Sequence, residues 1–239
     1  MTHKVSPIAH RLGISIGWKS RWFNVRGYRK NFTEDIKIRE FLQGLLRNMG
    51  IADIEIERSR NKLTVILSTS RPGLLIGRGG AGVEEIRKKI LALLRVSYAR
   101  GESAPKVMPE LRLEVKEIRT PEIYAELVGQ QVAEQLERRV PFRRVIKQSL
   151  ERVMSQKGVE GARIMIKGRL DGSEMARKEW VKNGRLPLQS FRADINYAHV
   201  NAYTIYGVIG IRVWIYRGEK LPAVAVTEAQ KEPARAGKK

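Results

Sequence analysis

The sequence predicts an α+β protein of two domains, and three observations support this. The chain has 239 residues, of which 42% are hydrophobic, so it can build two cores of ordinary size. Helical and alternating strand patterns follow one another along residues 34–119 and again along 120–218. The dipeptide Thr120-Pro121 separates the two sets, as expected for a domain boundary.

The first domain is expected to cover residues 34–119. Its expected elements are a helix over 34–49, strands over 53–57 and 63–68, a short helix, a helix over 83–94 and a strand over 111–116. Thr33 is predicted to be the N-cap of the first helix. Glu34 and Asp35 would then lie in its first turn, where the helix dipole favours carboxylates.

A glycine-rich loop lies between the second strand and the long helix of this domain. It consists of Gly77, Arg78, Gly79 and Gly80, a Gly-x-x-Gly sequence. Glycine lets the backbone approach a phosphate closely, and the following helix N-terminus favours anions. The loop and the element order α-β-β-α-α-β resemble a type II KH domain, in which such a loop clamps four nucleotides. A plain turn between two helices is the alternative interpretation.

The second domain is expected over residues 120–218 as an α/β sandwich, with two helices on a mostly antiparallel sheet. Its expected elements are helices over 123–136 and 142–153 and strands over 162–168, 190–198 and 203–216. Glycines between the first two of these strands predict irregular backbone there. Residues 1–33 are expected to form a basic N-terminal arm, and residues 219–239 a disordered tail without periodicity.

The charge balance points to a polyanionic partner. The chain has 46 Lys and Arg against 25 Asp and Glu, a formal charge of +21. Nucleic acid, an anionic membrane and an acidic protein are the candidate partners. The arm has aromatic residues that can stack on bases, which favours RNA contact over a solvated arm. It has no carboxylate, and its cations are Lys4, Arg11, Lys19, Arg21, Arg26, Arg29 and Lys30.

Two further cationic groups lie in the second domain. After Arg138 and Arg139, a helix places Arg143, Arg144 and Lys147 on one side, opposite its apolar residues. Only Glu151 offers a local counter-charge, so phosphate contact is favoured over a solvated polar face. The other group comprises Arg163, Lys167, Arg169, Arg177, Lys178, Lys182, Arg185 and Arg192. Trp180 lies in the same segment and is expected to serve packing.

The sequence does not support catalysis, a metal site, a cofactor or a membrane span. The chain has no cysteine and three histidines, so neither thiolate nor histidine metal sites are expected. No nucleophile–base–acid set and no phosphate-binding Gly-x-x-x-x-Gly-Lys-Ser/Thr sequence is present. No apolar run approaches the length that crosses a bilayer.

Several segments resemble the family of small-subunit ribosomal protein number three, in its bacterial or plastid form. The resemblance rests on the segments Lys4–Pro7, Arg11–Gly13, Arg71–Gly77, Gln135–Arg144, Gly168–Arg177, Gly184–Leu188, Arg192–Ile195, Tyr206–Gly210 and Val213–Ile215. Together they extend in one order over nearly the whole of the chain up to the tail.

The resemblance implies a structural protein of the small-subunit head that is not an enzyme. Its expected partners are rRNA, mRNA and ribosomal proteins number ten and fourteen, with neither a membrane nor a second copy of itself. Arg143, Arg144 and Lys147 match residues that grip incoming mRNA in the channel and help to unwind it. The arm cations, Arg138, Arg139 and the cations of segment 163–192 other than Lys182 are expected to contact rRNA. The location is the cytoplasm, or a plastid stroma.

The resemblance is incomplete in two places. The loop has one cation, Arg78, where two central basic residues are common in the family, so a weaker grip is expected. The connection over residues 97–110 is longer than in many relatives. A free-standing KH regulator of RNA is the main alternative, although it explains residues 34–118 and not the second domain. A nuclease or lyase is a third reading, which the absence of a catalytic set disfavours.

Overall fold

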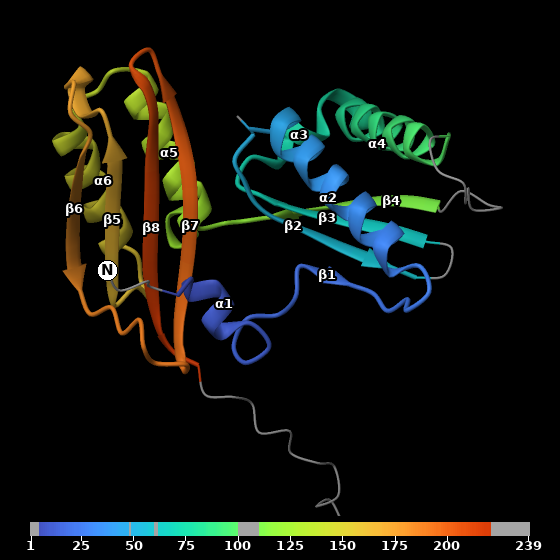
Figure 1. Ribbon diagram of the computed structural model, residues 1–239, viewed down its shortest axis with the longest axis horizontal. Coiled ribbons are helices and arrows are strands. Elements are labelled where there is room, and N and C mark those ends of the chain that lie inside the picture. The colour runs from blue at the N-terminus through green and yellow to red at the C-terminus, as the bar shows by residue number, and fades with distance from the viewer. Residues whose placement is uncertain (1–4, 48, 60–61, 100–109, 221–239) are drawn as a thin grey trace, which may run out of the picture.

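The computed structural model describes residues 5–47, 49–59, 62–99 and 110–220. Within these residues there are two four-stranded sheets, with the strand orders β1-β2-β3-β4 and β6-β5-β8-β7. Helices cover one face of each sheet, and the N-terminal segment runs from one unit to the other (Figure 1). The predicted α+β class is therefore confirmed.

Some predicted features fall wholly or partly outside the described residues. Residues 100–109 include most of the connection expected over 97–110, and residues 221–239 include most of the expected tail. The tail was expected from residue 219, but strand β8 (Gly207–Glu219) includes that residue. Lys4 of the arm also lies outside the described part.

The first unit has the element order predicted from the sequence. Its elements are α2 (Tyr28–Leu45), β2 (Ile51–Arg58), β3 (Lys62–Thr69), α3 (Pro72–Ile76), α4 (Ala81–Ala99) and β4 (Glu110–Glu117). Strand β3 pairs antiparallel with β2 and parallel with β4. The buried face of α2, with Ile38 and Leu42, packs with Ile90 of α4 against the strands. This is the type II KH arrangement.

Helix α2 begins earlier than the sequence predicts. Its N-cap is Gly27, so the prediction of Thr33 as N-cap is wrong, and the boundary expected after residue 33 falls inside the helix. Glu34 and Asp35 are buried, and both bind the side chain of Arg58 on β2. The Arg58 Nη1–Glu34 Oε2 distance is 2.7 Å, and Nε donates to Asp35 Oδ1 at 2.8 Å. The two acids therefore neutralise a largely buried arginine, whose side chain is 10% exposed, and do not serve the helix dipole.

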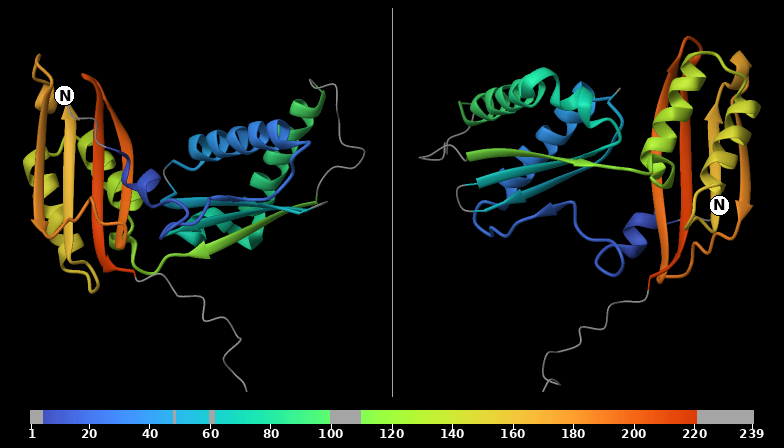
Figure 2. Two further views of the ribbon diagram at one scale, coloured as in Figure 1. Left: turned by 60° about the horizontal axis from the view of Figure 1, so that its bottom comes forward. Right: turned by 180° about the vertical axis from the view of Figure 1, so that it is seen from behind.

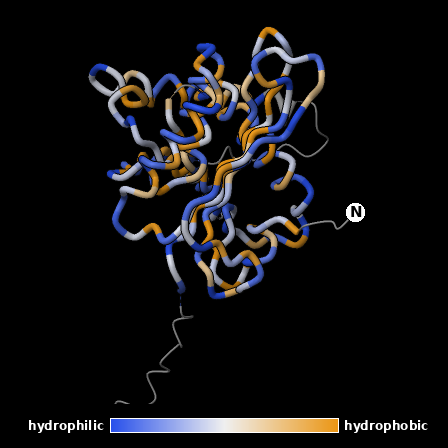
Figure 3. Tube along the Cα trace, turned by 90° about the vertical axis from the view of Figure 1, so that its left-hand side faces the viewer, coloured by the Kyte–Doolittle hydropathy of each residue, from blue (hydrophilic) through white to orange (hydrophobic). Residues whose placement is uncertain are grey.

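The second unit has two layers. Its elements are α5 (Ala125–Glu137), α6 (Phe142–Met154), β5 (Gly161–Gly168), β6 (Arg177–Gly184), β7 (Ala193–Thr204) and β8 (Gly207–Glu219). All neighbouring strands are antiparallel. Seen from behind, α5 and α6 lie in front of the sheet (Figure 2). Hydrophobic and hydrophilic residues alternate along the strands (Figure 3), and the hydrophobic ones on one face form the core with the helices.

Strand β6 replaces the irregular backbone that was expected between residues 168 and 190. It pairs with β5 along its whole length, from Gly161–Gly184 to Gly168–Arg177. Val181 is its one hydrophobic residue packed against the core, while charged residues occupy most other positions. The alternation of apolar and polar residues that predicts a strand is therefore hardly visible in β6, because charged residues occur on both of its faces. Strand β7 starts and ends later than the expected range 190–198, and strand β8 starts and ends later than the expected range 203–216.

The N-terminal arm is ordered against both units. Helix α1 (Pro7–Arg11) contacts strand β7, and strand β1 (Ser20–Arg21) pairs in parallel with β2. Arg39 of α2 fixes β1 in place, because its guanidinium donates to the Lys19 carbonyl at 2.9 Å and to the Ser20 hydroxyl at 2.8 Å. The arm thus adds a fourth strand to the KH sheet.

Arg11 attaches the arm to the second unit. Its side chain is fully buried, and its Nε donates to the Ala193 carbonyl at 2.8 Å. Its Nη2 donates to the Leu188 and Ser190 carbonyls at 3.0 and 2.8 Å, and the ring of His10 stacks on Phe191. Burial lowers the pKa of the Arg11 guanidinium from its ordinary value, and Asp194 partly offsets this. Arg11 was expected to contact rRNA, but its side chain has no solvent access here, so its role is structural.

Direct contacts between the two units also exist. The Gln130 side chain on α5 donates to the Ile51 carbonyl of β2 at 2.8 Å. Arg47 pairs with Glu137 at 2.7 Å, and its guanidinium lies 4.6 Å from the centre of the Tyr203 ring. Glu126 is also at this contact, where burial raises the pKa of its carboxyl, and Gln130 and Lys19 partly offset the effect.

We predict that Arg11→Ala destabilises the protein by about 2–4 kcal/mol, because several buried carbonyls lose their donor. Urea unfolding of the full chain would measure the loss. Arg26→Ala removes an exposed cation of the same arm and is the matched control, with an expected change below about 0.5 kcal/mol. Equal effects of the two substitutions would contradict the role given to Arg11.

We also predict a pH-dependent effect of Glu126→Gln. Because the folded-state pKa of Glu126 is raised, its favourable contribution is complete at low pH and is lost as pH rises through that pKa. Glutamine has no such loss. The variant should therefore gain stability relative to wild type between pH 4 and pH 7, measured by urea unfolding at each pH. A difference that does not vary with pH would show that this carboxyl is not destabilised by burial.

Candidate nucleic-acid interface

The glycine-rich loop has the geometry of an exposed turn between two helices. Gly77 follows α3 with φ +69°, and a 3-10 turn, η1 (Arg78–Gly80), leads into α4. Gly79 and Gly80 also have positive φ, +59° and +84°. Such values favour glycine. The loop therefore stands at the N-terminal end of a long helix, with the exposed Arg78 beside it, which suits binding of a phosphate.

Gly82 is a further residue of this loop that sequence reasoning missed. A Cβ at this position would lie 2.5 Å from the Leu75 carbonyl oxygen and 3.0 Å from that of Ile76. Only glycine therefore lets α3 and α4 approach closely enough to form the tight loop. The signal available was a further glycine two residues after the Gly-x-x-Gly sequence, at the first turn of a helix where alanine would be the ordinary choice.

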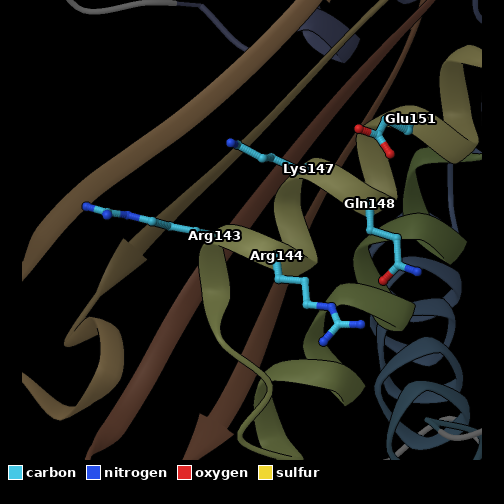
Figure 4. Close-up of a pocket in the computed structure, with 5 residues that line it drawn as sticks. All are labelled: Arg143, Arg144, Lys147, Gln148 and Glu151. Atoms are coloured by element: carbon cyan, nitrogen blue, oxygen red, sulfur yellow. The ribbon is translucent and has the colours of Figure 1, made fainter.

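Three cations of α6, Arg143, Arg144 and Lys147, lie together on its solvent side and form what we call the α6 stripe. Arg143, Arg144, Lys147, Gln148 and Glu151 line a shallow open depression. Figure 4 shows Arg143 and Lys147 extending in one direction and Arg144 in another. The opposite side of the helix is buried, as predicted. Within the described part of the chain, none of these three cations forms an ion pair.

Arg138 and Arg139 end helix α5 just before this stripe. Arg138 pairs with Glu134 at 2.5 Å, one turn earlier. Arg139 has φ +61°, a value that usually selects glycine, and its N–H donates to the Leu136 carbonyl at 3.0 Å. The N–H of Val140 reaches back to the Gln135 carbonyl, which completes the turn. A cation thus occupies a strained position where glycine would cost less.

The third cationic group is spread over two strands and the two connections that follow them. Arg163 and Lys167 lie on β5, and Arg177, Lys178 and Lys182 on β6. Arg169 donates to the Ser173 carbonyl at 3.0 Å and thereby holds a loop, while Arg185 and Arg192 are exposed in loop segments. The Arg177 guanidinium lies 5.3 Å from the Phe142 ring, which brings this group next to the α6 stripe.

The arm cations divide into paired and unpaired ones. Lys19 pairs with Asp53 at 2.8 Å, and Arg21 pairs with Glu55 and Glu57 of the KH sheet. Arg26 and Arg29 are exposed and form no ion pair in the described residues, whereas Lys30 is half-buried. The aromatic residues Trp18 and Phe23 line a groove of about 1470 Å³ between the arm and the two units.

The residues that the structure describes contain neither a candidate metal-binding group nor a candidate membrane-spanning helix. In that part of the chain, no group of three or more acidic or histidine side chains could hold a metal ion. Nor does any helix there combine the length and the apolar character needed to cross a bilayer.

A type II KH unit followed by a cationic antiparallel α+β unit defines an RNA-binding protein. The family profile described as "KH domain" matches residues 37–123, and the one described as "Ribosomal protein S3, C-terminal domain" matches residues 132–215. Neither description names an enzymatic activity.

The relatives identify the family over the whole chain. Small ribosomal subunit protein uS3 of Desulfovibrio desulfuricans is 47% identical over 222 residues, which are 92% of this chain and 97% of the relative. That of Lactobacillus helveticus is 41% identical over 93% of each chain, and that of Lactobacillus acidophilus 40% over 99% of each. The chain belongs to the uS3 family of small-subunit ribosomal proteins, which confirms the resemblance drawn from the sequence.

The loop geometry leads to a prediction about Gly79. Its Cβ direction is open, and its left-handed backbone conformation is one that Asp and Asn tolerate. Gly79→Asp should therefore fold normally but weaken binding of single-stranded decauridylate about 5-fold, because it places a negative charge beside a phosphate. Fluorescence anisotropy at low ionic strength would measure this. Gly79→Asn is the neutral control of the same shape, and equal affinities of the two variants would contradict phosphate binding by the loop.

Proposed function

We propose that this chain is a structural constituent of the small ribosomal subunit and binds RNA through both of its units. The observation that carries the proposal is the likeness to uS3 proteins along 92–99% of the chain, since both the KH unit and the second unit are included. The excess of 21 positive charges supports it, because phosphate backbones are the polyanions that such surfaces meet. The relatives named here are bacterial, so we place the protein on cytoplasmic ribosomes.

We further propose that the stripe on α6 faces mRNA in the channel through which it enters the ribosome. Arg143, Arg144 and Lys147 are exposed and extend into solvent from one side of a helix that is firmly packed on its other side. A rigid helix with unpaired cations can hold single-stranded RNA without base specificity, because contacts to phosphates carry no sequence information. Holding the strand while the ribosome moves would help to open mRNA structure without a fuel of its own.

The remaining predicted cations are proposed to contact rRNA, and all of those that the structure describes are exposed except Lys30 and Arg163, which are partly buried. They comprise Lys4, Lys19, Arg21, Arg26, Arg29 and Lys30 of the arm, Arg138 and Arg139, and Arg163, Lys167, Arg169, Arg177, Lys178, Arg185 and Arg192. Arg11 leaves this set because it is buried. Ribosomal proteins number ten and fourteen are the proposed protein neighbours, and the chain is proposed to act as a single copy.

A free-standing KH regulator is the alternative that must be separated from this proposal. It would use the KH unit alone and give the second unit no role, although relatives match that unit as well. Sedimentation with small ribosomal subunits in high salt distinguishes the two. A ribosomal constituent stays with the particle, whereas a regulator held by phosphate contacts dissociates.

We predict that Arg143→Ala with Arg144→Ala slows translation through a stable mRNA hairpin more than it lowers incorporation into subunits. The cations are on the surface, so the fold should be unchanged, whereas the grip on mRNA loses two phosphate contacts. A translation assay that compares structured and unstructured messages would measure the difference.

Arg112→Ala with Lys116→Ala is the matched control for this prediction. It removes the same charge from strand β4, where Arg112 pairs with Glu114 at 3.1 Å. Structured and unstructured messages should be affected equally by this control. If the α6 variant also fails to discriminate between the messages, or if assembly falls as much as translation, the assignment of the stripe to mRNA is wrong.

A further inference from the structure

The sheet of the second unit has one face that α5 and α6 do not cover. At one end of this face, Ile195, Trp214 and Tyr216 are buried against Leu186 and Leu188 of the β6–β7 connection, and the remainder is open. Helices α5 and α6 lie behind the strands in Figure 1, so the other face is turned to the viewer. The strand registers align its side chains in rows that run across the four strands. One row is Lys182, Arg163, Trp214 and Tyr197, and the next is Trp180, Met165, Arg212 and His199. Lys178 and Lys167 begin a third row that continues through Gly210.

The charges on this open face all have one sign. Its cations are Arg163, Lys167, Lys178, Lys182 and Arg212, and no Asp or Glu occupies any position of the three rows. Within the described residues, none of the five forms an ion pair. The corresponding outer face of the KH sheet is different, because Asp53, Glu55, Glu57 and Glu114 stand there among the cations. Cations without counter-charges repel one another, so the open face favours an anionic ligand.

An exposed indole lies among these cations. Trp180 on the edge strand β6 is 50% exposed, and it is not required for the core on the other face of the sheet. The Arg163 guanidinium lies 4.5 Å from the Trp180 ring centre and 5.2 Å from that of Trp214. Its Nε is buried and has no hydrogen-bond partner, so stacking is its main interaction. Arg163 thus positions the Trp180 ring on the sheet and leaves the rest of the ring accessible.

We propose that this open face binds unpaired ribonucleotides, with a base stacked on Trp180 and phosphates held by Lys167, Lys178, Lys182 and Arg212. The inference rests on the proposed RNA-binding function and adds the mode of binding, together with Lys182, Arg212 and Trp180 as ligand-contacting residues. A four-stranded sheet with a stacking aromatic residue accommodates two or three bases in other RNA-binding modules. Base stacking and unpaired cations are the two components of sequence-tolerant single-strand binding.

Other ligands fit this face less well. A protein partner would normally meet a surface with mixed charges and an apolar centre, whereas this face has five cations around one accessible indole. A double helix would meet the cations but would offer no base to Trp180, because its bases are stacked on one another. The other exposed apolar residues of this unit lie beyond the three rows. Tyr203 and Val208 pair next to the β7–β8 turn that contains Ile205 and Tyr206, and Met175 and Phe191 lie in the connections before and after β6.

The test is the binding of the full chain to single-stranded decauridylate and to a ten-base-pair RNA duplex, measured by fluorescence anisotropy. Trp180→Ala should weaken decauridylate binding about 5- to 100-fold, whereas Trp180→Phe should retain most of the affinity. Duplex binding should change little in either variant. Ultraviolet cross-linking of decauridylate should label the tryptic peptide 179–182, which contains Trp180.

The charge component has its own variant and control. Lys167→Ala with Lys178→Ala should lower the slope of log affinity against log salt by about 1.4, since each phosphate contact on single strands contributes about 0.7. Arg112→Ala with Lys116→Ala removes the same charge from a face of the KH sheet that also has carboxylates. This control should leave the slope of log affinity against log salt nearly unchanged. Circular dichroism of each variant verifies the fold.

The outcomes separate this inference from the proposed function. If the wild-type chain binds no RNA at low ionic strength, the RNA-binding function itself fails. If the wild type binds RNA but the Trp180 and lysine variants bind equally well, the open face is not the binding site and only this inference fails. If those variants bind RNA normally but no longer enter small subunits, the face contacts a protein, which also overturns the inference.

Discussion

The burial of the Arg11 guanidinium is the constraint on which the arrangement of the two units depends. A charged group without access to water needs a hydrogen-bond acceptor for each donor direction, and carbonyl oxygens from α1 and from residues 187–193 supply them. Because β1 is at the same time hydrogen-bonded into the KH sheet, the arm has an anchor in each unit. The contacts of Gln130 and Arg47 then act within a geometry that is already restricted.

The second organising principle is the distribution of the carboxylates. Asp53, Glu55 and Glu57 pair with arm cations, and Glu34 and Asp35 neutralise Arg58. Glu137 and Asp194 are likewise engaged with arginines of the folded chain. Many of the acids thus serve the KH sheet and the contacts that hold the chain together. The excess positive charge is consequently concentrated where carboxylates are few, on α6 and on the open face of the second sheet.

The sequence was sufficient to predict the elements whose apolar residues repeat against a core. The order of the KH unit, both helices of the second unit and the buried side of α6 follow from such periodicity. The beginning of α2 was missed because its first residues are exposed and polar, so that tertiary contacts extend the helix. The role of Arg11 could not be found from sequence, since a lone arginine in a basic arm gives no sign of the carbonyls, 179 and 182 residues later, that accept its hydrogen bonds. For the candidate site, the sequence identified the residues of the glycine-rich loop and of the α6 stripe. Which residues share the open face of the second sheet could be learned only from the strand register.

Strand β6 was not predicted because it is rich in charged and exposed residues, and some of the same residues form the proposed RNA-binding face. A strand at the edge of a sheet needs few core residues, and charged residues on it also prevent pairing with other chains. In β6 one side of the strand carries Arg177 beside Phe142 of the α6 helix, and the other side carries Lys178, Trp180 and Lys182. Of the side chains of β6, Val181 packs against the core, and most of the others lie at the surface. Hydrophobic periodicity is weak in such a strand because most of its side chains are exposed, and the residues that conceal the strand include Lys178, Trp180 and Lys182, which are proposed to meet RNA.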